Sequence, residues 1–327
     1  MAEKRKLGNS GIEVHPLCLG GNVFGWTADE PTSFKVLDGF LAADFEFIDT
    51  ADMYSTWVPG HKGGESETII GKWMKQRGKR KKVVLATKCG LPMGEEKKGL
   101  SKKYILQAAE DSLRRLQTDY IDLYQAHQDD PATPLDETLE AFAQLIKQGK
   151  VREIGASNYK ADRLADALSV SKRKGLPRYE SLQPQYNLYD RAEYEATLEP
   201  LCLKERLGVI PYYSLASGFL SGKYRSKGDL GQSARGGKVG NYLNDRGFRI
   251  LTALDQVAKQ NNSTPARVAL AWLIARTSIT APIASATKLD QLTDLIESTR
   301  LKLDSNAIDL LNQASSERAE PVGSVAV

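Results

Sequence analysis

The stretch that decides the fold is Phe47-Ile48-Asp49-Thr50-Ala51-Asp52-Met53-Tyr54. Together with the two residues before it, its first part is mostly large and apolar, which predicts a short buried strand. The strand runs into a carboxylate, a turn of small residues and a tyrosine. Polar side chains just beyond the C-terminal end of a buried strand are where α/β folds place their chemistry. Taken alone, the stretch is also typical of a helix cap followed by a half-buried aromatic residue, so the remaining chain must decide.

The same strand-then-helix pattern recurs along the whole chain. Short apolar segments predict eight buried strands, at 17–21, 45–49, 83–88, 120–127, 151–158, 180–185, 209–212 and 281–284. Seven of them lead directly into a helical pattern, and the helices are expected at 31–43, 65–75, 101–116, 135–147, 161–174, 191–206, 245–260, 264–275 and 289–299. Such alternation predicts a parallel sheet.

Eight units in a chain of 327 residues favour a closed (β/α)8 TIM barrel over an open doubly wound sheet. The open fold is the alternative, but no Gly-x-Gly-x-x-Gly follows a predicted strand. An N-terminal β-hairpin is expected at 6–14, an extended loop after the seventh strand at 214–244, and an extra C-terminal helix at 304–316. We therefore expect one barrel domain over residues 1–327, with 319–327 as a loose tail.

Composition and charge argue against several classes of protein. The net charge of +4 is small for this length, so it predicts neither a nucleic-acid partner nor a membrane partner. The basic run at 75–82 contains no aromatic residues and precedes a strand, which is typical of a solvated loop at the bottom of a barrel. Cys18, Cys89 and Cys202 have unrelated spacings, which indicate neither disulfides nor a metal site. We expect a cytoplasmic protein.

The C-terminal ends of the predicted strands carry an unusual set of polar residues. In a barrel all these ends meet at one face, so residues far apart in sequence become neighbours. Tyr54 lies just past the first end, and the ends in order are Asp49, Lys88, His127, Ser157-Asn158, Gln183 and Tyr212. The residues at the N-terminal ends of the strands, on the opposite face of the barrel, show no comparable set of polar side chains.

Four of these side chains make chemical sense together. A tyrosine has a pKa near ~10, and a neighbouring ammonium such as Lys88 would lower it. A carboxylate such as Asp49 keeps that lysine charged, and His127 could hold a carbonyl oxygen. The set can protonate an oxygen on which negative charge develops, but it holds no hydride donor, so it calls for a nicotinamide cofactor. Lys88 could instead be the Schiff-base lysine of a barrel lyase, although Tyr54 would have no use there.

Several stretches of the sequence point to one known family. Besides residues 47–54, they are Ala86-Thr87-Lys88, Gln125-Ala126-His127, Gly149-Lys150-Val151-Arg152-Glu153-Ile154-Gly155-Ala156-Ser157-Asn158, Gln183-Pro184-Gln185-Tyr186-Asn187 and Leu215-Ala216-Ser217-Gly218-Phe219-Leu220-Ser221-Gly222-Lys223-Tyr224. Over nearly its full length, the chain therefore resembles the aldo-keto reductase superfamily. It is nearest to the branch that includes bacterial general-stress reductases and potassium-channel β subunits.

The resemblance implies a catalytic tetrad of Asp49, Tyr54, Lys88 and His127. It implies NADPH, no metal, and direct hydride transfer that reduces a small aldehyde or ketone to an alcohol. Tyr54 would be the general acid, Lys88 would lower its pKa and Asp49 would position Lys88. His127 would orient the carbonyl group. The oligomeric state and the individual substrate stay open.

The resemblance also implies where the cofactor and the substrate lie. The nicotinamide carboxamide is expected at Ser157, Asn158 and Gln183, with Tyr212 stacked on the ring. The pyrophosphate side is expected at Leu215, Ser217, Lys223 and Arg235. The 2′-phosphate and adenine are expected at Ser285, Thr287, Lys288, Gln291 and Asp294. Further cofactor contacts are expected at Gly21, Asn22, Tyr213, Ser214 and Ala216. The substrate pocket is expected at Trp26, Tyr54, Trp57 and His127.

Four residues, at three places in the sequence, depart from the family's pattern. Tyr213-Ser214 stands where many relatives have Ser-Pro, Ser285 replaces a common glycine and Leu295 replaces a common asparagine. These departures bear on the adenine contacts and the preference for NADPH, and they leave the tetrad intact. The resemblance also implies an alternative function, an NADPH-binding redox-sensing or regulatory module with weak turnover. An intact tetrad does not separate the two.

Overall fold

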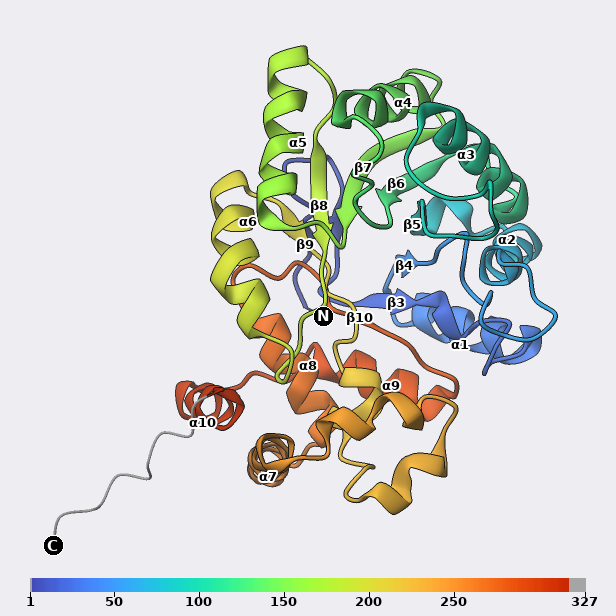
Figure 1. The fold of residues 1–327 in the computed structure, drawn as a ribbon. Helices are drawn as coiled ribbons and strands as arrows, with labels where there is room; N and C mark the ends of the chain where they lie inside the picture. The colour runs from blue at the N-terminus through green and yellow to red at the C-terminus, as the bar shows by residue number, and fades with distance from the viewer. Residues whose placement is uncertain (1, 318–327) are drawn as a thin grey trace, which may run out of the picture.

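Eight parallel strands form one curled sheet in the computed structural model, which describes residues 2–317 (Figure 1). They are β3 (Cys18–Gly20), β4 (Phe47–Asp49), β5 (Val84–Cys89), β6 (Ile121–Ala126), β7 (Val151–Ser157), β8 (Tyr179–Gln183), β9 (Gly208–Val209) and β10 (Ile283–Ala284). They pair in the order β10-β3-β4-β5-β6-β7-β8-β9.

The sheet closes into a barrel between β9 and β10, the strands at its two edges. Val209 forms a parallel bridge with Ile279, and the Ile283 N–H donates to the Pro211 oxygen at 2.9 Å. The chain therefore folds as a (β/α)8 barrel, as the sequence predicts, and the open doubly wound sheet is excluded.

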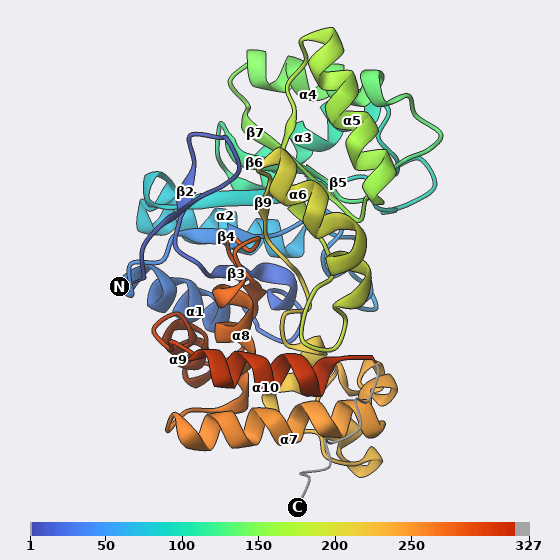
Figure 2. The same cartoon turned by 90° about the vertical axis from the view of Figure 1, so that its left-hand side faces the viewer.

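Helices surround the sheet (Figures 1 and 2). They are α1 (Glu30–Ala42), α2 (Glu65–Arg77), α3 (Lys102–Leu116), α4 (Leu135–Lys147), α5 (Ala161–Lys174), α6 (Glu199–Glu205), α7 (Asp245–Gln260), α8 (Pro265–Ala275), α9 (Leu289–Ser298) and α10 (Ser305–Ser315). Ser101 caps α3 by accepting from the Tyr104 N–H. Among residues 2–317, no helix combines the length and the hydropathy that crossing a membrane requires.

Alternation along the strands decides which side chains face the barrel interior. Phe47, Ala86 and Leu123 belong to one buried cluster inside the barrel. Side chains two positions further along a strand point the same way. The residues two positions beyond these three are Asp49, Lys88 and Gln125. An apolar layer in the barrel interior thus supports a polar layer at its C-terminal mouth.

A β-hairpin closes the opposite end of the barrel, as predicted. Strands β1 (Arg5–Lys6) and β2 (Glu13–Val14) pair antiparallel. Leu7 and Val14, both fully buried, join the interior cluster, and the Arg5 guanidinium donates to the Ile279 oxygen at 2.8 Å. The hairpin therefore plugs the barrel from below.

The region around α6 corrects one sequence prediction. The sequence predicts this helix at 191–206 with Gly208 as its capping glycine. In the structure it contains a π-helical turn at Tyr194–Leu198 before α6, and it ends at Arg206, which is in the left-handed region. Gly208 lies in β9, where a Cβ would stand 2.8 Å from the Gly8 nitrogen of the hairpin. Glycine is needed there for close approach of two backbones, and not for a helix cap.

The long loop after β9 is largely made of short 3-10 turns. They are η4 (Ala216–Ser221), η5 (Lys227–Gln232), η6 (Gly236–Lys238) and η7 (Gly240–Tyr242). The basic run at 75–82 is tied down more firmly than the expected solvated loop. Arg80, in the turn η2 (Arg80–Lys82), pairs with Asp122 at 2.7 Å and lies 3.8 Å from the Tyr120 ring centroid. We propose that the chain is a single domain; the tail expected at 319–327 lies outside the described residues.

The hairpin turn yields a prediction about stability. Gly8 has φ +65°, and a Cβ there would stand 2.2 Å from the Glu180 oxygen. Gly8→Ala should therefore lower the free energy of unfolding by about 1–3 kcal/mol, as measured by urea denaturation. Gly11→Ala, in the same turn, meets nothing within 4 Å and is the matched control. Equal effects of the two variants would contradict the close fit of the plug.

Candidate active site

The structure brings the four predicted catalytic residues together at the C-terminal mouth of the barrel. Asp49 ends β4, Lys88 lies near the end of β5 and His127 directly follows β6. These three strands are neighbours in the sheet, and Tyr54 lies in the turns that follow β4. Asp49 and Lys88 are fully buried, while His127 is nearly so and Tyr54 is half-buried.

The Lys88 ammonium is the hub of this group. It donates to Asp49 Oδ2 at 2.7 Å, to the Thr50 oxygen at 2.6 Å and to the Tyr54 hydroxyl at 2.9 Å. A lysine has three N–H donors, so all of them are used. The Tyr54 hydroxyl also lies 3.4 Å from Asp49 Oδ2. The phenol therefore contacts a cation and an anion at once.

Asp49 is held by two amides in addition to the lysine. Gln183 Nε2 donates to Asp49 Oδ1 at 2.9 Å and Gln125 Nε2 donates to it at 3.2 Å. Gln125 is a site residue that sequence reasoning missed, although alternation gives the signal, because it lies two positions before His127 in a predicted strand. Gln183, expected at the carboxamide, has its amide nitrogen turned toward Asp49 in this structure.

The phenol of Tyr54 is held in its protonated form. Burial raises its pKa well above the ordinary value, and the Asp49 carboxylate raises it further. The sequence argument expected Lys88 to lower the Tyr54 pKa, and the net direction in the free protein is the opposite. The reason is that burial disfavours the charged phenolate, and the Asp49 carboxylate beside the hydroxyl disfavours it further. Tyr54 thus enters any reaction with its proton in place.

His127 is a neutral imidazole at neutral pH. Burial, with the Lys88 charge as a second cause, lowers its pKa well below the usual value. Its ring centroid is 6.1 Å from that of Tyr54, and its buried Nδ1 has no hydrogen-bond partner among residues 2–317. An imidazole beside the phenol can contact a small polar molecule without bringing a charge.

The polar residues at the strand ends after His127 are connected by hydrogen bonds. Asn158, with φ +54°, donates to the His127 oxygen at 2.9 Å and accepts from the Tyr212 hydroxyl at 2.8 Å. Ser157 donates to the Gln183 oxygen at 2.9 Å. The three residues expected at a nicotinamide carboxamide are therefore adjacent, with Tyr212 beside them.

The loop after β9 contains strained backbone and two of the cations expected at the cofactor. Tyr213, Ala216 and Ser217 all have positive φ, which is uncommon for residues other than glycine. Lys223 is exposed, whereas Arg235 lies 5.4 Å from the Trp26 ring centroid and has a buried Nη2 without a partner among the described residues. A mostly buried guanidinium lacking an acidic partner suits an anionic ligand such as a phosphate.

The residues expected at the 2′-phosphate and adenine gather at the ends of β3 and β10. Asn22 accepts from Ser285 Oγ at 2.6 Å, which joins the two strand ends, and Gly21 precedes it. Gln291 accepts from the Thr287 N–H at 2.8 Å, while Lys288 directly precedes α9. Asp294 pairs with Arg267 at 2.7 Å and so points its carboxylate at a neighbouring helix.

Two tryptophans stand beside Tyr54. The Trp57 ring centroid is 6.0 Å from that of Tyr54 and 5.5 Å from that of Trp26. Trp57 is 44% exposed, so it offers an apolar wall to an incoming molecule. The expected substrate-pocket residues thus adjoin one another. Among the described residues, no group of three or more His, Cys, Asp or Glu side chains could hold a metal ion.

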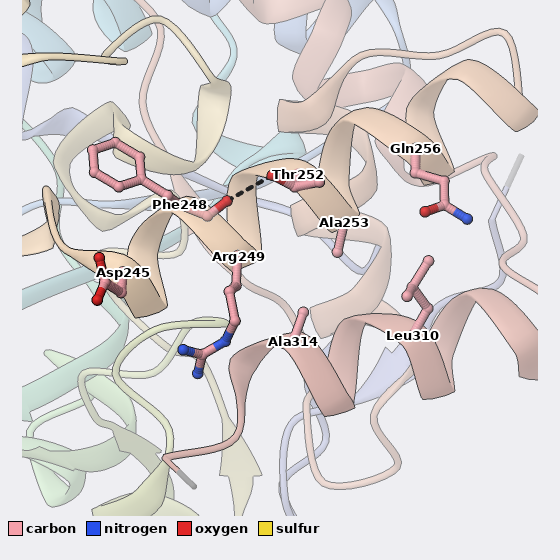
Figure 3. A pocket seen from close by; sticks show the side chains of 8 residues that line it. All are labelled: Asp245, Phe248, Arg249, Thr252, Ala253, Gln256, Leu310 and Ala314. Atoms are coloured by element: carbon pink, nitrogen blue, oxygen red, sulfur yellow. Dashed lines mark hydrogen bonds between the residues drawn. The ribbon is translucent and has the colours of Figure 1, made fainter. Parts of the chain in front are cut away.

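A separate surface pocket of about 410 Å³ lies between α7 and α10, away from the strand ends (Figure 3). It is shallow, and Phe248, Ala253, Leu310 and Ala314 form its apolar part. None of the tetrad residues lines it, so it takes no part in the site described above.

Comparison with known proteins gives a consistent result. The model of the Aldo/keto reductase family matches residues 16–316. "Uncharacterized oxidoreductase YrpG" of Bacillus subtilis is 37% identical over 313 residues, covering 94% of each chain. "Protein tas" of Escherichia coli is 31% identical, covering 93% of this chain and 94% of its own. "Probable voltage-gated potassium channel subunit beta" of Oryza sativa is 32% identical, covering 89% of each.

The buried ion pair predicts a strong effect on stability. Asp49→Asn leaves the Lys88 charge buried without a counter-charge, so the free energy of unfolding should fall by about 3–5 kcal/mol. Asp49→Asn combined with Lys88→Met removes both charges and should be less destabilising than the single change. Urea denaturation of the wild type, the single variant and the double variant measures this, and a double variant that is no more stable than Asp49→Asn would contradict a coupled pair.

His127 predicts a dependence of stability on pH. Its pKa is lower in the folded than in the unfolded chain, so its contribution to stability is present above about pH 6.5. That contribution is lost as the pH falls below this value, because the unfolded chain binds the proton more readily. The melting temperature of His127→Asn should therefore decline less between about pH 7 and pH 5 than that of the wild type. Parallel curves would refute a buried neutral imidazole.

Proposed function

The chain belongs to the aldo/keto reductase family of oxidoreductases, and from this premise we propose that it reduces aldehydes or ketones to alcohols with NADPH. The observation that carries the proposal is the buried contact of Lys88 with both Asp49 and the Tyr54 hydroxyl. A protonated phenol beside an ammonium is a proton donor placed in a site that largely excludes water.

We propose a role for each of the four residues, and their contacts support these roles. NADPH, when bound, supplies a hydride to the carbonyl carbon and leaves as NADP⁺. Tyr54 gives its proton to the carbonyl oxygen as negative charge develops there. Lys88 stabilises the phenolate that results, which offsets the raised pKa of Tyr54 in the free protein. Asp49 keeps Lys88 charged and oriented, and neutral His127 orients the carbonyl group.

The cofactor residues expected from the sequence are part of this proposal. Ser157, Asn158 and Gln183 would hold the carboxamide and Tyr212 would stack on the nicotinamide. Lys223 and Arg235 would meet the pyrophosphate beside Leu215 and Ser217, because Lys223 is an exposed cation and Arg235 has a buried Nη2 without a partner among the described residues. The adenine end and the 2′-phosphate would lie at Ser285, Thr287, Lys288, Gln291 and Asp294. The other proposed contacts are Gly21, Asn22, Tyr213, Ser214 and Ala216.

We further propose a small-molecule carbonyl substrate that rests against Trp26 and Trp57, and a cytoplasmic location. Cys18, Cys89 and Cys202 are all buried and unpaired, which suits a reducing compartment.

One relative supports a second candidate function. Because a potassium-channel β subunit is 32% identical to this chain, an NADPH-binding regulatory module with weak turnover is the alternative. Tight NADPH binding without reduction of any carbonyl compound, together with a co-purifying partner, would favour that alternative.

The test of the proposed function is the oxidation of NADPH in the presence of a panel of aldehydes. Tyr54→Phe removes the proton donor and leaves the ring, so kcat should fall by at least about 100-fold while the Kd for NADPH stays within about twofold. Tyr120→Phe, at the opposite end of the barrel, is the matched control and should keep full activity. Normal turnover by Tyr54→Phe would show that another group donates the proton.

A further inference from the structure

Three ionisable side chains lie directly behind the Tyr54 segment and have no part in the proposed chemistry. They are Asp52, Glu67 and Arg115, from the turn after β4, from α2 and from α3. Glu67 is fully buried, Asp52 is 1% exposed and the Arg115 side chain is 24% exposed. Buried charges of this kind are costly unless they serve one another.

Glu67 links three elements of the barrel wall. Its Oε1 accepts from Thr87 Oγ1 at 2.6 Å, and its Oε2 accepts from Arg115 Nε at 2.6 Å. Thr87 precedes Lys88 in β5, and successive side chains of a strand point to opposite faces. Glu67 therefore holds the outer side of the strand that presents Lys88 to the barrel mouth.

Arg115 also lies against the backbone that returns from the Tyr54 segment to α2. A Cβ at Gly64 would stand 2.3 Å from Arg115 Cδ and 2.6 Å from its Nε. Gly64 has φ +85°, a conformation that favours glycine, and directly precedes α2. The arginine side chain is thus packed tightly against this turn, between the turn and Glu67.

Asp52 completes the group through its charge and its main chain. Its backbone N–H donates to the Lys88 oxygen at 3.1 Å. Both of its carboxylate oxygens are buried and have no hydrogen-bond partner among residues 2–317. Burial and the Glu67 charge raise the Asp52 pKa, while the Arg115 charge lowers it. The Lys88 charge lowers it as well, and the net direction of the Asp52 pKa is a rise. Arg115 pairs with Glu67 and acts on Asp52 only through its charge.

We propose that Arg115 is a positioning residue for Tyr54. By pairing with Glu67 and packing against Gly64, it keeps residues 50–64 closed on β5. That closure keeps the Tyr54 hydroxyl within hydrogen-bond distance of the Lys88 ammonium, although Arg115 itself touches neither group. The inference deepens the proposed function and rests on it for its kinetic readout.

The test uses variants that separate position from charge and from stability. Arg115→Met alone leaves the Glu67 charge buried without a counter-charge, so a loss of folding would obscure its effect on position. Glu67→Gln combined with Arg115→Met removes one charge of each sign and leaves the net charge of the group unchanged. Arg114→Met is the control, since that neighbour on α3 is 72% exposed and pairs with Asp111 within its own helix.

The first readout is hydrogen exchange over residues 50–64, measured by mass spectrometry, which needs no turnover. The double variant should exchange at least about tenfold faster there than the wild type, with the Arg114→Met protein unchanged. Equal exchange in the double variant and the wild type would overturn the proposal, whether or not the protein reduces a carbonyl compound.

The second readout is the kinetics of aldehyde reduction. In the double variant, kcat should fall by about tenfold or more while the Kd for NADPH and the alkaline pKa of kcat stay unchanged. A misplaced acid has this signature, because the local charge is preserved and only geometry is lost. Wild-type kcat in the folded double variant would overturn the proposal. Absence of turnover in the wild type would instead refute the proposed function, and the exchange measurement would still decide the role of Arg115.

Discussion

A lysine and an aspartate that face each other at 2.7 Å inside the barrel, both fully shielded from water, set the conditions for the whole site. Two charges in such a place are tolerated only if their remaining donors and acceptors are satisfied. Here Lys88 donates its other two hydrogen bonds to the Thr50 oxygen and the Tyr54 hydroxyl. The amides of Gln183 and Gln125 donate to the second carboxylate oxygen of Asp49. Placement of the tyrosine is thus a consequence of satisfying the ion pair.

The inner and outer sides of the barrel sheet carry different groups of residues. Inside, apolar residues such as Phe47 and Ala86 form a layer beneath Asp49 and Lys88, and the N-terminal hairpin seals that layer from below. Outside, Glu67 and Arg115 join α2, β5 and α3 behind the same strands. The inner side carries the polar residues of the site, and the outer side carries the ion pair that we propose holds them in position. Because β5 is shared by both, a change on the outer side can reach the site without any contact with it.

The sequence predicts the barrel and the polar residues at its strand ends because both depend on local, periodic signals. A strand that is buried on both faces reads as an apolar run, and the polar residue at its end is visible directly. Gln125 could have been found in the same way, since it shares a face with His127. Other features have no such signal. The ending of a helix at Arg206, the need for glycine at position 208 and the direction of the Tyr54 pKa all depend on neighbours that are distant in sequence.

The amino-acid sequence by itself therefore determined the eight-fold repeat of strand and helix, the polar strand ends and the likeness to one family. Only the tertiary structure decided which of these groups touch and what state they are in. It buried the Tyr54 hydroxyl beside the Asp49 carboxylate, which raises the pKa of the phenol, and it set Arg115 against Gly64. The physical reason is that hydrophobic periodicity is a property of neighbouring residues in the sequence. Burial and the interactions between charges depend on elements that come together only on folding.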